Sequence, residues 1–199
     1  MKAVAVQIMV VALICGTGNL AFGGTIKGKV TAHGVRDNAN AVVYIEKIPG
    51  KTFPAPKKHA EFDQKNLAFH PHVLPILVGT TVDFLNSDDV LHNVFSPDKC
   101  AGSLNLGTWP KGQIRSYTFT QPGCKAVILC NVHPEMEAWA VVLETPYFAL
   151  SSKEGNYEMK DVPAGKYTLS IWHEKLKGPP QEITVPESGE VTANFDVKR

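Results

Sequence analysis

The sequence is poor in the residues and motifs that mark several common classes of protein. It contains only 4 methionines and 7 histidines, and neither type is clustered. A Cys-x-x-Cys-His motif is absent, which excludes a covalently attached haem of the c type. No nucleophile elbow and no phosphate-binding loop occurs, so no hydrolase or nucleotide site is indicated. The formal net charge is +1, which gives no reason to expect a nucleic-acid partner.

Sustained helical periodicity is also missing, and beyond the N-terminus no apolar run is long enough to span a bilayer. Many short β-branched runs, with 16 Gly and 14 Pro, instead predict an all-β protein. Residues 1–23 are typical of a secretory signal peptide, because Lys2 precedes a short apolar segment and Ala21-Phe-Gly23 ends in small residues. We therefore expect a periplasmic or otherwise exported protein without a membrane span. Lipidation of Cys15 is disfavoured by the bulky Ile14 before it.

One short motif carries three candidate metal ligands. Cys130-Asn-Val-His-Pro-Glu-Met136 places a thiolate, an imidazole and a thioether at positions i, i+3 and i+6. With His92 as a second imidazole, the set matches a type 1 copper site, which has two His, one Cys and a weak axial Met. The sequence therefore predicts one copper ion held by His92, Cys130, His133 and Met136. Zinc is the competing metal, although its structural sites rarely use a thioether. The other alternative is that Cys130 and Met136 are ordinary buried residues.

These motifs resemble the cupredoxins, a family of blue copper proteins, and the short Cys-x-x-His-Pro-x-Met loop is most similar to the amicyanin subgroup. The stretch from Leu74 to Ser96 adds to a resemblance that covers about residues 60–144. It implies a Greek-key β-sandwich that carries single electrons between periplasmic redox partners. It also implies that Asn93 ties the strand of His92 to the ligand loop by hydrogen bonds, and that His133 is the electron exit.

The C-terminal part of the chain has a different character, with short strands separated by turns. The run from Gly155 to Leu169 resembles the carboxypeptidase regulatory-like β-sandwich, a transthyretin-like module. That module opens with strands of the kind found here at Gly24–Val30 and Ala41–Ile45. We therefore expect a discontinuous Ig/transthyretin-like sandwich with the copper domain inserted in it, at residues 24–50 plus 146–199 and 57–145 respectively. The alternative assigns the first two strands to the sheet of the copper domain.

The number of cysteines in the mature chain gives a further expectation. If Cys15 leaves with the signal peptide, Cys100, Cys124 and Cys130 remain. An odd number in an exported protein calls for an explanation. One thiolate on the metal and a Cys100–Cys124 disulfide account for all three, in an oxidising compartment that permits the bond. The alternative is a pair of unpaired buried thiols.

Two other motifs contain histidine. His70-Pro71-His72 could be a second metal pair, but Pro71 interrupts any strand ladder, so a solvated loop is favoured. Trp172-His-Glu174 could be a docking point or a weak metal site, and a partly buried tryptophan beside a turn is the favoured interpretation.

The functional expectation is an exported electron carrier. A copper enzyme needs further His-x-His pairs, and His70-Pro-His72 is the only one, so the sequence predicts no enzyme. Glu135 and Glu137 place negative charge near the ligand loop, where it would steer a basic partner such as a c-type cytochrome, or another periplasmic or membrane oxidoreductase. The alternative function is a periplasmic copper-binding protein for storage, delivery or tolerance.

Overall fold

The protein is all-β. A computed structural model describes residues 23–199, so the expected signal peptide and Cys15 lie outside the described residues apart from Gly23. Residues 23–199 contain one short 3-10 helix, η1 (Lys99–Ala101), and no α-helix. None of the helical structure in this range is long and apolar enough to cross a membrane. The strands are β1 (Gly23–Ala32), β2 (Val42–Ile45), β3 (Ala60–Gln64), β4 (Phe69–His70), β5 (Val73–Leu77), β6 (Thr81–Asn86), β7 (His92–Phe95), β8 (Asn105–Trp109), β9 (Ile114–Thr118), β10 (Lys125–Leu129), β11 (Glu137–Leu143), β12 (Phe148–Leu150), β13 (Asn156–Pro163), β14 (Gly165–Trp172), β15 (Gln181–Val185), β16 (Glu190–Thr192) and β17 (Phe195–Val197).

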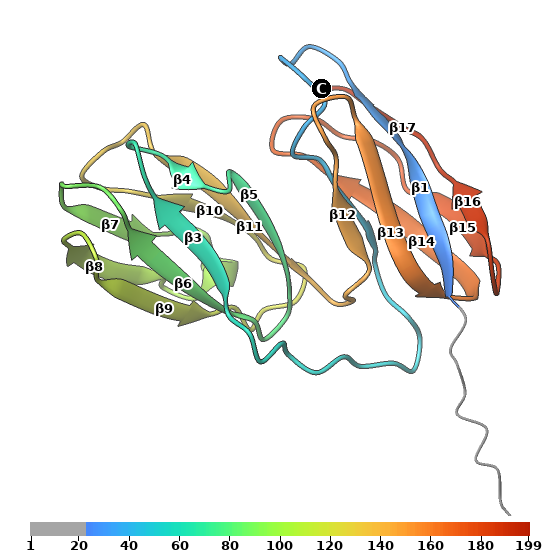
Figure 1. Cartoon of the computed structure of the whole chain (residues 1–199), viewed down its shortest axis with the longest axis horizontal. Coiled ribbons are helices and arrows are strands. Elements are labelled where there is room, and N and C mark those ends of the chain that lie inside the picture. Colours follow the sequence, from blue (N-terminus) through green and yellow to red (C-terminus); the bar gives the residue numbers. More distant parts are fainter. Residues whose placement is uncertain (1–22) are drawn as a thin grey trace, which may run out of the picture.

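The strands pair in two separate groups (Figure 1). In the first sandwich, β3 to β11, one sheet has the order β5-β11-β10-β7-β8 and the other β4-β3-β6-β9. In the second sandwich, β1, β2 and β12 to β17, the orders are β13-β1-β16, with β17 also on β1, and β12-β2-β14-β15. From Gly23 on, the chain therefore runs first in the second sandwich, crosses to the first through residues 46–59, and returns after β11.

Strand alternation explains the core of the first sandwich. Strand β6 buries every second residue, which places Val82, Phe84 and Asn86 inside. Phe84 stacks on Phe62 of β3, its parallel neighbour, with ring centroids 5.5 Å apart. Residues with period two on a pleated strand line one face, so this face covers the core. Since β7 and β10 belong to the opposite sheet, their inward side chains meet the same core.

The second sandwich has its own core, centred on β1. Ile26 and Val30 of β1 are fully buried and pack with Leu169 of β14. Gly28 lies between them, where a Cβ atom would come within 1.7 Å of the Ala193 carbonyl oxygen. Only glycine allows β1 to approach the segment between β16 and β17 this closely.

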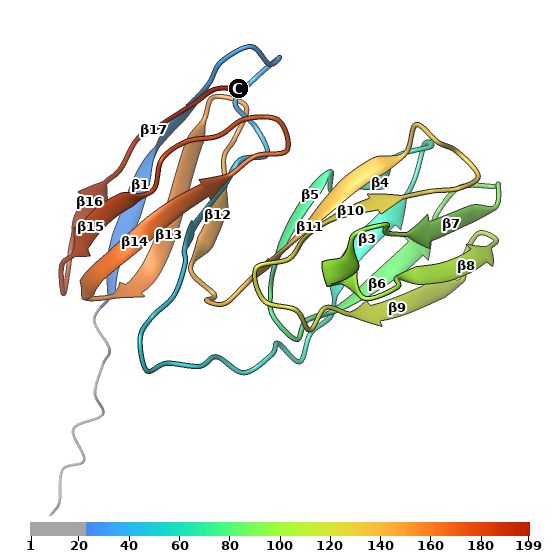
Figure 2. The same cartoon turned by 180° about the vertical axis from the view of Figure 1, so that it is seen from behind.

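A third apolar cluster joins the two sandwiches, which lie side by side in both views (Figure 2). Trp139 of β11 packs against Trp172 of β14 with ring centroids 5.5 Å apart. The hydroxyl of Thr145 donates to the Ile45 carbonyl, where the chain re-enters the second sandwich. The members of the cluster are Val42, Tyr44, Val73, Trp139, Val141, Leu143, Phe148 and Trp172.

Candidate metal centre

Three potential ligands converge at one end of the first sandwich. His92 is the first residue of β7, Cys130 follows β10, and His133 lies in the loop that leads to β11. One ligand atom from each residue lies within 4.8 Å of the others. The two Nδ1 atoms of His92 and His133 are 3.0 Å apart, and Cys130 Sγ is 3.9 Å from His92 Nδ1. This is the one such group of His, Cys, Asp and Glu side chains among residues 23–199.

The orientation of the His92 ring is fixed by Asp88. His92 is fully buried, and its Nε2 donates to Asp88 Oδ2 at 2.9 Å. Because Nε2 carries the proton, Nδ1 of the neutral ring presents a lone pair toward His133 and Cys130. Metal-binding histidines are commonly oriented in this way through their second nitrogen. Asp88 is not among the site residues that the sequence predicts.

Asp88 is itself held by the turn between β3 and β4. The backbone amides of Asn66 and Leu67 donate to its two carboxylate oxygens at 2.7 and 3.0 Å. Burial raises the pKa of the Asp88 carboxyl, but these hydrogen bonds and the one from His92 lower the pKa more, so it lies below its ordinary value. The carboxylate therefore remains an acceptor for His92.

Asn93 connects the histidine strand to the ligand loop. Its backbone amide points at Cys130 Sγ at 3.4 Å and holds the sulfur in place. Its side-chain nitrogen donates to the Gly107 carbonyl of β8 at 2.8 Å and to Asn105 at 3.2 Å. Its side-chain oxygen accepts from the Asn131 amide at 3.3 Å. One residue thus holds β7, β8 and the loop in register.

Met136 closes the ligand loop. Its backbone amide donates to the His133 carbonyl at 3.0 Å. The side chain is buried in the same core cluster as Cys130, so its thioether belongs to the interior side of the loop. The structure thus brings His92, Cys130 and His133 together as one set and buries Met136 beside the loop.

The donor set suits a metal ion. Cys130 is buried and free of any disulfide, and two imidazole nitrogens 3.0 Å apart need a proton or a cation between them. A thiolate with two imidazoles favours a soft or borderline metal over calcium or magnesium, which take oxygen ligands.

Exposed apolar side chains flank this end of the sandwich. Leu91 and Val90, just before His92, are 53% and 45% exposed, and Val132 of the ligand loop is 44% exposed. His133 is only partly covered, whereas His92 is fully buried. Of the two histidines, His133 is therefore the one that a partner molecule can approach.

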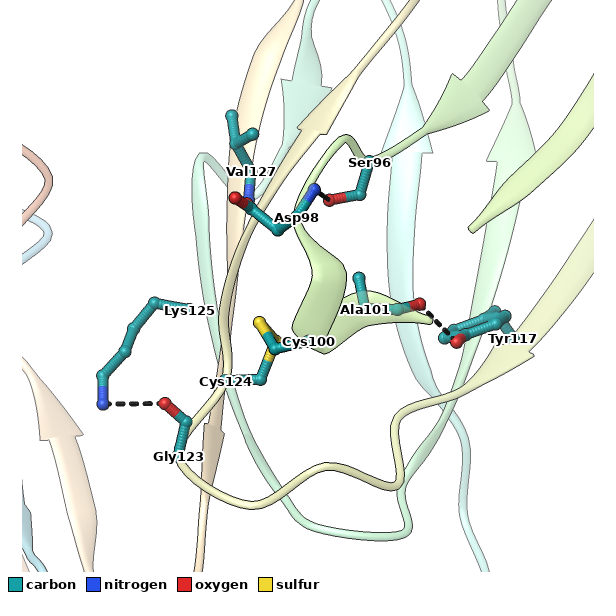
Figure 3. Close-up of a disulfide and its surroundings, with 9 residues drawn as sticks. All are labelled: Ser96, Asp98, Cys100, Ala101, Tyr117, Gly123, Cys124, Lys125 and Val127. Atoms are coloured by element: carbon teal, nitrogen blue, oxygen red, sulfur yellow. Dashed lines mark hydrogen bonds between the residues drawn. A yellow bond between two sulfur atoms is a disulfide. The ribbon is translucent and has the colours of Figure 1, made fainter. Parts of the chain in front are cut away.

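The other two cysteines form a disulfide with each other (Figure 3). Cys100 of η1 and the buried Cys124 before β10 are bonded, with Cα atoms 5.5 Å apart. Their surroundings are tied by further bonds: Tyr117 donates to the Ala101 carbonyl, and Asp98 accepts from the Val127 amide at 2.7 Å.

Of the two remaining histidine motifs, Trp172-His-Glu174 matches the expectation, because Trp172 is partly buried where β14 ends, and His70-Pro71-His72 differs from it. His70 ends strand β4 instead of lying in a solvated loop, and it contacts the Lys65 carbonyl. His72 does not join it in a metal pair, because its Nε2 faces Glu174 of the second sandwich at 3.0 Å. Sequence reasoning could not bring these two motifs together, since 102 residues separate His72 from Glu174.

No known protein family matches the chain, and no curated protein matches it. Among solved structures, a copper-containing nitrite reductase from Thermus scotoductus is similar, with 26% identity, a TM-score of 0.42, and coverage of 51% of this chain and 25% of the reductase. The Cu(I) form of an amicyanin mutant has 27% identity and a TM-score of 0.41, over 52% and 98% of the two chains. A purple cupredoxin from Nitrosopumilus maritimus has 26% identity and a TM-score of 0.38, over 42% and 98%.

The comparison corrects one expectation from the sequence. The lack of further His-x-His pairs predicts that the chain is not an enzyme, yet one of the similar structures is named as a nitrite reductase. This chain spans about a quarter of that protein. The similar structures thus include an enzyme as well as amicyanin, and the expectation of a non-enzymatic protein is withdrawn.

Proposed function

We propose that this chain is an exported type 1 copper protein that carries single electrons between redox partners. The observation that carries the proposal is the convergence of one cysteine sulfur and two histidine nitrogens within 4.8 Å, with Nδ1 of His92 left free by Asp88. His92, Cys130 and His133 would supply the equatorial ligands, and the buried Met136 the axial one. When bound, copper supplies a Cu(I)/Cu(II) couple at a fixed position.

The residues around the ligands support electron transfer, because they resist rearrangement. Asp88 fixes the His92 ring, and Asn93 fixes both Cys130 and the loop. A site that cannot relax far presents nearly the same geometry to both oxidation states. Each transfer then requires little movement of the protein.

The exposed surface around His133 fits a protein partner. Val90, Leu91 and Val132 offer apolar area at this end of the sandwich, and both Glu135 of the loop and Glu137 at the start of β11 are exposed. The partner we propose is a basic redox protein, such as a c-type cytochrome or a periplasmic or membrane oxidoreductase. Apolar contact would give close approach, and opposite charge would raise the rate of encounter.

The proposed domains follow the pairing of the strands. We assign residues 57–145 to the copper domain and residues 24–50 plus 146–199 to the second sandwich. In support, β1 and β2 pair with strands that follow residue 146, and the described pairings include none between them and β3 to β11. Insertion is tolerated where the two ends of a loop lie close together.

The proposal is tested by titrating the mature protein with Cu(II) and recording absorption and EPR spectra. We expect one copper per chain with an intense visible band from thiolate-to-copper charge transfer. Cys130→Ser and Cys130→Ala should abolish the band. His33→Gln, which removes an exposed histidine of the second sandwich, is the control and should keep it. A coloured Cys130→Ala variant with full copper content would refute the site.

A redox titration then separates electron transfer from storage, delivery or tolerance. An electron carrier should cycle reversibly between the two copper states and exchange electrons with a soluble cytochrome. Tight copper binding without such exchange would favour the alternative function.

A further inference from the structure

A single carboxylate from the second sandwich reaches across to the first. Glu174 follows β14, and its Oε2 accepts a hydrogen bond from the indole nitrogen of Trp139 at 3.1 Å. The same oxygen lies 3.0 Å from Nε2 of His72. Both partners belong to the first sandwich, on β11 and just before β5. Glu174 is therefore the polar centre of a contact whose apolar part is the Trp139–Trp172 pair.

His72 is bonded through both ring nitrogens to groups that can only accept. Nε2 faces the carboxylate of Glu174, and Nδ1 lies 3.2 Å from the carbonyl oxygen of Glu137. A carbonyl and an ionised carboxylate can only accept hydrogen bonds, so the His72 ring is the donor toward them. The ring thus links the second sandwich to the first residue of β11.

His72 also contacts the two residues Glu137 and Trp139, which lie just after the ligand loop. Glu137 directly follows Met136 and is the first residue of β11. The backbone amide of Trp139 donates to the His72 carbonyl at 2.8 Å, so His72 grips this strand at two points. Contacts that hold His72 in place therefore also restrict the end of the ligand loop.

We infer that Glu174 is a positioning residue, supplied by the second sandwich, that steadies the exit of the ligand loop through His72. The inference rests on the proposed function for its consequence at the metal and on geometry alone for the contact itself. It gives the second sandwich a role toward the site, because its carboxylate replaces solvent as the partner of His72.

The charges around His72 agree with this role. Glu174 also binds the Lys175 ammonium through its other oxygen at 3.0 Å, and Glu137 has an exposed side chain. Burial raises the pKa of Glu174, but the hydrogen bonds from Lys175 and His72 lower the pKa more, so it lies below the ordinary value. Burial lowers the pKa of His173, the residue before Glu174, which favours its neutral form.

Hydrogen exchange in the metal-free mature protein tests the contact without copper. Glu174→Gln should speed exchange of the Trp139 indole and backbone N–H groups by about tenfold or more, as expected for the loss of a charged hydrogen bond. Glu187→Gln changes the same charge at an exposed position of the second sandwich and should change exchange less than twofold, within the range of neutral surface substitutions. Equal exchange in the two variants would overturn the inference. A uniform increase across the second sandwich would also overturn it, because that pattern means loss of folding.

A double-variant cycle shows whether Glu174 acts through His72. His72→Gln should speed exchange of the Trp139 amide about as much as Glu174→Gln, and the double variant should add little to either. Additive effects would mean that the two residues act separately, which contradicts the inference.

Copper release from the loaded protein supplies the functional readout. We expect Glu174→Gln to release copper to a chelator faster than Glu187→Gln. A ratio of one between the two rates refutes the link to the site. If no variant binds copper, the proposed function fails, and the exchange experiment still decides the contact.

Discussion

At the scale of single residues, the candidate metal centre depends on side chains that orient the ligands. Asp88 selects the tautomer of His92, and Asn93 joins Cys130 to the loop through one amide group. Neither residue needs to bind the metal for its loss to disturb the site, because a ring or sulfur free to turn no longer presents its donor atom.

Replacement of Met136 by glutamine tests the axial position. An amide oxygen is harder than a thioether and favours Cu(II), so the variant should stay coloured and keep its copper, while its reduction potential falls. A tenfold change in the one-electron equilibrium is about 59 mV, which a redox titration resolves. Met159→Leu, in the core of the second sandwich, is the control and should leave the potential unchanged. An unchanged potential in Met136→Gln would mean that Met136 is not the axial ligand.

The residues of this site differ in how far the sequence could predict them. The types and spacing of His92, Cys130, His133 and Met136 predict a metal site, because few other chemistries use that set. Asp88 lies four residues before His92, and an acidic residue at that spacing was the available signal. It was not decisive, since its role depends on a turn of another strand that places two amides around the carboxylate.

At the scale of elements, strands with a buried face were predictable, and exposed edge strands were not. The sequence predicts β1 and β2 to within two residues at either end, because alternation or a β-branched run marks each of them. Strands β8 and β9 are edges of their sheets and mostly exposed, so no apolar pattern marks them. The last two strands, β16 and β17, are short and pair with different parts of β1.

The disulfide links η1 to the residue before β10, and its loss should lower the stability of the first sandwich. The Cys100→Ala/Cys124→Ala variant should unfold with a free energy about 3 kcal/mol lower, since a bond across 24 residues restricts the unfolded chain. Urea unfolding measures the difference, and reduction of the wild-type protein should reproduce it. A loss well under 1 kcal/mol in both experiments would show that the bond contributes little.

At the scale of the whole molecule, two separate cores meet through one small contact. Each sandwich buries its own cluster, and the shared cluster holds eight side chains. The resemblance of short motifs predicted two sandwiches, but the contact itself was beyond prediction. It pairs Trp139 with Trp172 and His72 with Glu174, and sequence spacing gives no information on how two folded units face each other.

Trp172→Ala tests how far this contact couples the two sandwiches. The indole ring packs on Trp139, so its removal should cost the contact roughly 2–3 kcal/mol, below the usual range for a fully buried tryptophan. Copper bound at the first sandwich stabilises that sandwich by about 2.7 kcal/mol at a hundredfold excess over its dissociation constant. In the wild type, calorimetry should show one unfolding transition that copper shifts upward as a whole. In Trp172→Ala we expect two transitions, of which copper shifts only one.

Leu176→Ala, in the core of the second sandwich, is the control: it should lower stability, yet copper should still shift the unfolding of both sandwiches together. If Trp172→Ala still shows a single shifted transition, the sandwiches are coupled by the chain crossings and by Glu174, and not by the aromatic pair.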